Sequence, residues 1–224
     1  MKKSICAVTW YSVVVVNHGD KSASVLLGNG NATFQTEQNE LFITYVYPLF
    51  ITTEDFNSDH ILDLAISTEG YLGNRIYIFL GNGDGTFSET NLYDVGDTPT
   101  SIAVGDFNDD GQLDLVVANF NDSSLSILFG YGNGTFQNQQ LYKLDSHPSF
   151  VATGHLNHDN ALDLVVANSA DDTISLLFGN GEGMFSDQKK YRNVHVPNCV
   201  TIGDFNNDFN LDIVVGNGWD TNVR

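Results

Sequence analysis

The sequence predicts an all-β protein, a β-propeller built from four-stranded antiparallel blades, because three markers recur along the chain in one frame. An acidic phrase starts at intervals of 51, 49 and 49 residues: DFNSDHILD at Asp55, DFNDDGQLD at Asp106, HLNHDNALD at His155 and DFNNDFNLD at Asp204. A proline lies seven residues before each start, and a glycine-rich phrase such as GNGDGTF at Gly81 keeps the same spacing. Together these markers indicate a structural repeat of about 50 residues.

Each copy contains four runs that are typical of short β-strands. In the best-preserved copy, TSIAVGDF follows Pro99, which suits the start of a strand because that position can lack an N–H. LDLVVAN and LSILFG are the second and third runs, apolar on both faces like strands buried between packed sheets. A glycine-rich turn leads to TFQNQQLYKL, which contains the fourth. No stretch shows helical periodicity, and a β-solenoid is the alternative, although its repeats are usually shorter.

The frame predicts a single propeller region, 1–224, with about four blades' worth of strands. We expect a partial blade over 12–47, repeats over 48–98, 99–147 and 148–196, and a partial blade over 197–217. The run VVVVN (residues 13–17) aligns with a second strand, although Lys2 and Lys3 before apolar residues leave a short signal peptide as the alternative. Each end of the chain supplies a second strand, and in a closed ring the two strands would compete for the same place in one blade. This favours an incomplete segment of a larger propeller over a closed four-bladed ring.

Composition narrows the classes of partner. Asp and Glu outnumber Lys and Arg by 28 to 9, and the net charge of −19 argues against nucleic acid and anionic membranes and for cations. The 42% apolar content is enough for a core, while no apolar run approaches the roughly 20 residues that span a membrane. Cys6 and Cys199 occupy different repeat positions, so free thiols are expected.

The acidic phrase 106–114 has the ligand spacing of a calcium loop. Side-chain oxygens fall at positions 1, 3, 5 and 9, a carbonyl would serve at position 7, and glycine at position 6 permits a sharp turn. Ca²⁺ takes about six to eight oxygens and would cancel the repulsion between the carboxylates. Position 12 is apolar in every copy and strands flank the loop, so it is not an EF-hand. The predicted ligands are Asp106, Asn108, Asp110, Gln112 and Asp114.

The other copies depart from this pattern. Two keep every side-chain ligand but carry His60 or Phe209 at the glycine position. The third begins with His155, a poor calcium ligand, so we expect a weak or empty site there; a zinc site using His155 and His158 is the less favoured alternative. The predicted ligands are Asp55, Asn57, Asp59, Ile61 and Asp63; Asn157, Asp159 and Asp163; and Asp204, Asn206, Asp208, Asn210 and Asp212.

The phrases GDFNxDGxxDLVVAN and LFGNGxGTF resemble the FG-GAP/VCBS repeats of integrin α-subunit propellers and of many secreted proteins, over roughly residues 13–217. The resemblance implies an extracellular or secreted β-propeller, or the ectodomain of a larger protein, with Ca²⁺ between the first and second strands. Two features depart from the family pattern: SICAVTWYS (residues 4–12) stands where the first acidic loop should lie, and His155 replaces a carboxylate.

The loops favour a calcium-binding module for adhesion or for binding protein or glycan. In an up-and-down blade the calcium loops and the glycine-rich turns share one face. The opposite face carries loops 17–22, 68–74, 119–124 and 168–173, which differ most between copies, as binding loops do. Sequence divergence of loops that bind nothing would produce the same variation between copies. Open terminal strands predict self-association.

The sequence also predicts that the protein is not an enzyme. It contains no nucleophile elbow, no HExxH and no dinucleotide loop, and His18, His147 and His195 are isolated, so no catalytic residue is assigned. The alternative is a propeller-based enzyme, or its accessory domain, acting on polysaccharide. Sequons at Asn31, Asn121 and Asn133 would be usable if a eukaryote secretes the protein.

Overall fold

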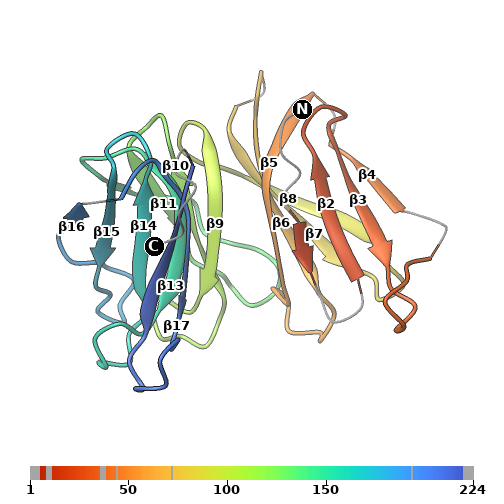
Figure 1. The fold of residues 1–224 in the computed structure, drawn as a ribbon. Helices are drawn as coiled ribbons and strands as arrows, with labels where there is room; N and C mark the ends of the chain where they lie inside the picture. Colours follow the sequence, from red (N-terminus) through yellow and green to blue (C-terminus); the bar gives the residue numbers. More distant parts are fainter. Residues whose placement is uncertain are drawn as a thin grey trace.

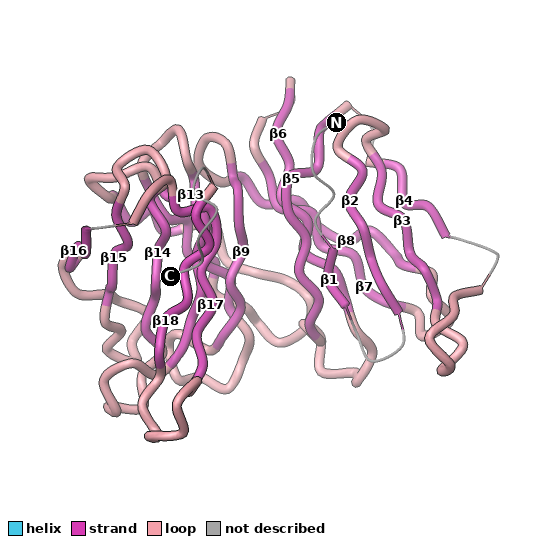
Figure 2. The backbone as a smooth tube through the Cα atoms, viewed as in Figure 1, coloured by secondary structure: helices cyan, strands magenta, loops and turns pink. Residues whose placement is uncertain are grey.

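The computed structural model describes residues 6–8, 12–35, 39–43, 45–71, 73–192 and 194–218. Within these residues the regular structure consists of eighteen β-strands, and no helix occurs (Figure 2). They form four four-stranded antiparallel sheets and one two-stranded sheet, each with its strands in chain order. The predicted all-β class and four-stranded antiparallel blades are therefore confirmed. Across the described ranges no helix is long and apolar enough to cross a lipid bilayer.

Five blades follow one another along the chain (Figure 1). The first contains β1 (Cys6–Val8), β2 (Ser12–Asn17), β3 (Ser22–Leu27) and β4 (Asn39–Phe42). The second contains β5 (Val46–Glu54), β6 (Asp63–Gly70), β7 (Arg75–Gly81) and β8 (Phe87–Asp94). The third contains β9 (Pro99–Gly105), β10 (Asp114–Asn119), β11 (Ser124–Leu128) and β12 (Gln140–Lys143). The fourth contains β13 (Pro148–Gly154), β14 (Asp163–Asn168), β15 (Thr173–Leu177) and β16 (Lys189–Arg192), and the fifth β17 (Pro197–Gly203) and β18 (Asp212–Asn217).

The hydrophobic core lies between neighbouring blades. The second strand of the third blade, β10, is buried on both faces: Leu115 and Val117 pack toward the second blade, Val116 and Ala118 toward the fourth. Fully burying a Val or Leu side chain contributes about 1.5–3 kcal/mol, so this strand anchors two interfaces at once. The apolar character of the second strands on both faces follows from this double burial.

The first strands of consecutive blades lie side by side, and hydroxyl groups join them. In the second to fifth blades the strand register slips by one residue just after the proline, and three Ser or Thr side chains reach the proline carbonyl of the next blade. The three bonds are Ser67 Oγ to Pro99 O (2.8 Å), Thr100 Oγ1 to Pro148 O (3.3 Å) and Ser149 Oγ to Pro197 O (2.8 Å). Each bond stabilises the array by about 1 kcal/mol.

The N-terminal blade differs in one respect from the prediction. Residues 13–16 do form a second strand, within β2, whose Val14 and Val16 are buried. The sequence analysis began this blade at residue 12, but β1 precedes β2 and pairs with it from Cys6↔Val15 to Val8↔Val13. The short spacing between β1 and β2 hid this strand, because the acidic phrase that marks the first strand elsewhere is missing. Residues 1–5 and 9–11 lie outside the described residues.

Candidate functional site

The four acidic loops share one backbone conformation. Position 6 adopts a left-handed φ in every copy: 81° at Gly111, 66° at His60, 68° at Asn160 and 69° at Phe209. A side chain in this region of φ costs about 1 kcal/mol or more relative to glycine. Three copies therefore keep the loop shape despite this strain, including the copy with the bulky phenylalanine that the sequence analysis noted.

In loop 106–114 the predicted ligand side chains turn toward the loop's own backbone. Asp106 accepts hydrogen bonds from the N–H groups of Asp110 (Oδ1, 3.1 Å) and Gly111 (Oδ2, 2.7 Å). Asn108 Oδ1 accepts from Asp110 N (3.2 Å), and Asp110 Oδ1 accepts from Gln112 N (2.8 Å). Two carboxylates and one amide are thus gathered over one turn, and each oxygen keeps a lone pair for a further partner.

Asp114 has a different environment. Its side chain is fully buried, and its two oxygens accept hydrogen bonds from Phe107 N (2.9 Å) and Gly130 N (2.8 Å). Burial raises the pKa of Asp114 to about 6, and the charges of Asp110 and Asp106 add to the rise, although both backbone bonds oppose it. The carboxylate therefore ties the acidic loop to the end of the third strand.

The same tie recurs in the other blades. Asp63 accepts from Phe56 N (2.9 Å) and Gly81 N (2.8 Å), and Asp163 accepts from Leu156 N (2.7 Å) and Gly179 N (3.0 Å). Burial raises the pKa of both carboxyl groups. In the first blade Ser12 takes this position, with its Oγ 3.4 Å from Gly28 N. The sequence analysis assigned these aspartates only as ligands and missed the tie, although a glycine follows each of Asp114 and Asp163 by a constant spacing.

The donors of loop 106–114 fit a calcium ion by their chemistry, because carboxylate, amide and carbonyl oxygens are the hard ligands that Ca²⁺ prefers. Asp106, Asn108 and Asp110 would hold the ion together with the carbonyl of Gln112, and Asp114 lies behind them. In the described part of the chain, no group of three or more His, Cys, Asp or Glu side chains is gathered closely enough to hold a metal. Burial is the main cause of the raised pKa of Asp114, and a cation would relieve the smaller contribution that comes from Asp110 and Asp106.

The loop of His155 departs from the others. His155 Nδ1 lies 2.9 Å from the carbonyl oxygen of Ala161, the group that would serve as the position-7 ligand. Asn157 and Asp159 keep their positions, with a 2.7 Å bond from Asn157 Nδ2 to Asp159 Oδ2. The imidazole thus engages the position-7 carbonyl and adds no ligand to the loop.

The acidic loops of the second and third blades also contact the glycine-rich turn of the blade that follows. Gly134 N donates to Phe56 O (2.8 Å), and Gly183 N donates to Phe107 O (2.9 Å). A Cβ at position 183 would lie 2.3 Å from the Phe129 ring, so this close approach requires glycine. The expectation that the acidic loops and the glycine-rich turns share a face agrees with these contacts.

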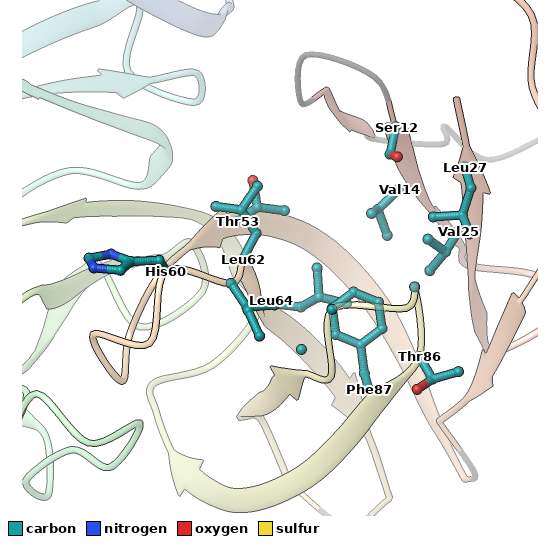
Figure 3. Close-up of a pocket in the computed structure, with 14 residues that line it drawn as sticks. Ser12, Val14, Val25, Leu27, Thr53, His60, Leu62, Leu64, Thr86 and Phe87 are labelled. Atoms are coloured by element: carbon teal, nitrogen blue, oxygen red, sulfur yellow. The ribbon is translucent and has the colours of Figure 1, made fainter. Parts of the chain in front are cut away.

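A hollow of about 390 Å³ lies beside the first blade, where the acidic loop is missing (Figure 3). Its walls are mainly apolar: Leu64 and Phe87 face Val25 and Leu27, while the His60 ring points away from them. In later blades a phenylalanine from the acidic loop packs on the residue equivalent to Phe87, as in the Phe56–Phe136 and Phe107–Phe185 pairs (centroids 5.6 and 5.9 Å apart).

The opposite face carries a cluster that the sequence analysis missed. His18 is not isolated: its ring stacks on Tyr47 with centroids 5.0 Å apart, and its Nε2 lies 3.7 Å from Glu69 Oε1. Lys21 Nζ lies 4.5 Å from the centroid of the Tyr47 ring. A second hollow of about 460 Å³ adjoins the cluster. It is lined by Tyr47, Glu69, Gly70, Tyr71, Asn74, Asp97, Thr98 and Asn121. These residues do not recur in every blade. The sequence signal for them is the interval of 51 residues between the first two acidic phrases, which is two residues longer than the later intervals.

A family model described as FG-GAP-like repeat matches the chain three times, at residues 55–117, 106–166 and 155–215. A search of curated proteins found no match. The matched repeats together cover more than half of the chain.

Many solved structures resemble the fold. A protein from Lactobacillus plantarum is 18% identical with a TM-score of 0.68, and the match covers 95% of this chain and 63% of that one. A periplasmic gluconolactonase from Pseudomonas aeruginosa is 14% identical (TM-score 0.60; 90% and 53% covered). A protein titled as a candidate 6-phosphogluconolactonase from Bacteroides fragilis is 18% identical (TM-score 0.65; 93% and 56% covered). The chain therefore spans less than two thirds of each of these structures.

The comparison corrects one prediction. The sequence predicts that the protein is not an enzyme because no catalytic motif interrupts the repeat, and this exclusion was wrong, because proteins named as lactonases share the fold. A propeller assembles a site from loops of several blades, so its polar groups are far apart in sequence and leave no local motif. At this level of identity the likeness shows the fold alone.

Proposed function

The chain belongs to the family of proteins built from FG-GAP-like repeats, and on this premise we propose that it is a calcium-binding repeat module that presents a ligand-binding face. In this proposal the protein is secreted or otherwise lies outside the cell, where calcium is present at millimolar concentration. The partner is a protein or a glycan that meets the loops opposite the acidic ones.

One observation carries the proposal: an asparagine and an aspartate share one turn, with the same hydrogen bond between them and the backbone in successive blades. In loop 106–114 burial is the main cause of the raised pKa of Asp114, and repulsion from Asp110 and Asp106 adds to it. Such repulsion makes the loop less stable unless a cation offsets it. Bound Ca²⁺ would supply that positive charge, while Asp114 keeps the loop attached to Gly130.

The test compares thermal unfolding of the intact chain in EDTA and in millimolar CaCl₂. Extracellular calcium modules bind with dissociation constants of about 10⁻⁴–10⁻³ M. At tenfold excess over that constant one site adds roughly 1.4 kcal/mol, so two or three sites add about 3–4 kcal/mol. The melting temperature should rise by several degrees in Ca²⁺ and less in Mg²⁺, which demands a tighter octahedral shell. An unchanged melting curve, with no heat of Ca²⁺ binding in calorimetry, would reject the proposal.

A hydrolytic activity is the second candidate, favoured by the lactonases among the structural neighbours. It is tested by incubating the chain with gluconolactone and with a panel of polysaccharides. Turnover that exceeds the rate in buffer alone would support it, and turnover at the buffer rate would reject it.

A further inference from the structure

One loop on the face opposite the acidic loops is two residues longer than its equivalents. The paired residues Thr68 and Arg75 enclose positions 69–74, whereas Asn119 and Ser124 enclose only 120–123. This insertion accounts for the first repeat interval of 51 residues, since the later intervals are 49. In Figure 1 the β6–β7 end rises at the top of the view, and the β17–β18 loop lies at the bottom. The insertion therefore alters the binding face and leaves the acidic face unchanged.

The inserted loop forms one wall of the 460 Å³ hollow. Tyr71, at its tip, is fully exposed, with a relative exposure of 102%. Tyr47, on the neighbouring strand β5, is partly buried and contacts His18 and Lys21. Two tyrosines thus line the hollow, one held in place and one open to solvent.

Polar groups from three loops complete the hollow. Asn74 Nδ2 donates to Asp97 Oδ1 (3.0 Å), and Asn121 Nδ2 donates to Thr98 Oγ1 (2.7 Å). These bonds order the amides and the carboxylate before any ligand arrives, and the remaining lone pairs and N–H groups are available to hydroxyl groups. The volume lies in the range of small-molecule sites.

We propose that this hollow binds a neutral saccharide, with Tyr47 and Tyr71 against the sugar and Glu69, Asn74 and Asp97 bonding its hydroxyl groups. A sugar ring has an apolar C–H face and a rim of hydroxyls, which matches aromatic rings beside carboxylate and amide groups. The net charge of −19 disfavours acidic sugars, and Lys21 already takes the cation-binding position on Tyr47. The inference deepens the proposed function by naming the ligand class, and it rests on the binding part of that proposal.

The experiment titrates the intact chain, in millimolar CaCl₂, with neutral tetrasaccharides of glucose, mannose, galactose and N-acetylglucosamine, followed by calorimetry and saturation-transfer NMR. We expect at least one tetrasaccharide to bind, and Tyr71→Ala to weaken it about tenfold, a change of about 1.4 kcal/mol. Tyr131→Ala is the matched control, because Tyr131 is 60% exposed and lies in a glycine-rich turn on the acidic face. It should leave binding unchanged.

Asp97→Asn should weaken binding only a few-fold, because the amide retains one acceptor oxygen. Thermal unfolding of each variant confirms that it folds. The inference is overturned if no tetrasaccharide binds, or if Tyr71→Ala and Tyr131→Ala have equal effects. Binding of a lysine-rich peptide in place of every saccharide, lost in Tyr71→Ala, would also overturn it in favour of a cationic partner. Failure of calcium stabilisation with saccharide binding intact would reject only the calcium proposal.

Discussion

The loops 106–114 and 155–163 have the same shape and different chemistry. Both are left-handed at positions 4 and 6, and in both an aspartate at position 9 joins the loop to the third strand. Their internal hydrogen bonds diverge at position 1: Asp106 accepts two backbone N–H groups, whereas His155 contacts the Ala161 carbonyl. The fold of the loop therefore depends on turn geometry and on the buried aspartate, and the first carboxylate can vary without changing it.

The largest expected effect falls on what the two loops share. Asp114→Asn and Asp163→Asn should each lower the free energy of unfolding in EDTA by about 2–4 kcal/mol, because an amide N–H₂ would face a buried backbone N–H. Urea denaturation measures the change, and Asp187→Asn, at an exposed position, is the control. If only one of the two variants has a lower free energy of unfolding, the buried aspartate does not have the same role in both loops.

The pH dependence should separate the loops next. The pKa of Asp114 is raised to about 6, so between about pH 4 and pH 6 the folded chain keeps a proton that the unfolded chain releases. In EDTA this carboxyl group should therefore lower the stability as the pH rises through that window, by up to about 2–3 kcal/mol.

The contribution is measured as the difference between the parent and Asp114→Asn across the pH range. Asp163 should contribute less, because among the acidic side chains only Asp159 raises its pKa, whereas both Asp110 and Asp106 act on Asp114. Equal contributions would show that the first carboxylate is unimportant to the charge balance of the loop.

Calcium bound in loop 106–114 should raise the free energy of unfolding by about 1.4 kcal/mol at tenfold excess over the dissociation constant, and loop 155–163 should gain less. Asp110→Asn should remove a larger part of the calcium-induced rise in melting temperature than Asp159→Asn, since the second loop already lacks its first carboxylate. His155→Asp should give loop 155–163 a calcium-induced rise in melting temperature comparable to that of loop 106–114. If both asparagine variants lose the same amount, the His155 loop binds calcium as well as its neighbour does.

The smallest effects concern the left-handed turn itself. Gly111→Ala should destabilise the chain by about 1 kcal/mol, because no atom lies within 4 Å of the added Cβ and only the positive φ opposes it. Asn160→Gly should stabilise by about 0.5 kcal/mol or less, since asparagine tolerates this region better than most residues. Both values come from denaturation in EDTA; an unaffected Gly111→Ala would mean that the loop relaxes.

Much of the fold could be predicted because its signals are local. The strand β9 begins at Pro99, where the sequence placed its entry, and the acidic phrase locates the loop that follows. The tie from Asp114 to Gly130 was missed because its donor lies beyond the third strand, and the constant spacing of aspartate and glycine does not by itself identify a bond. His18 was called isolated because its partner Glu69 lies 51 positions further along the chain, in the next blade.

The bonds from Gly134 to Phe56 and from Gly183 to Phe107 all run in one sense along the chain. Through these bonds the loops 55–63 and 106–114 each hold the glycine-rich turn of the blade that follows, whereas apolar side chains such as Leu162 in loop 155–163 pack against the blade before. The array consequently has a direction, and nearest-neighbour coupling of this kind spreads a local disturbance asymmetrically. A disturbance of loop 106–114 should therefore loosen the turn at Gly183 before the turn at Gly134, and hydrogen exchange should quicken toward the C-terminal side first.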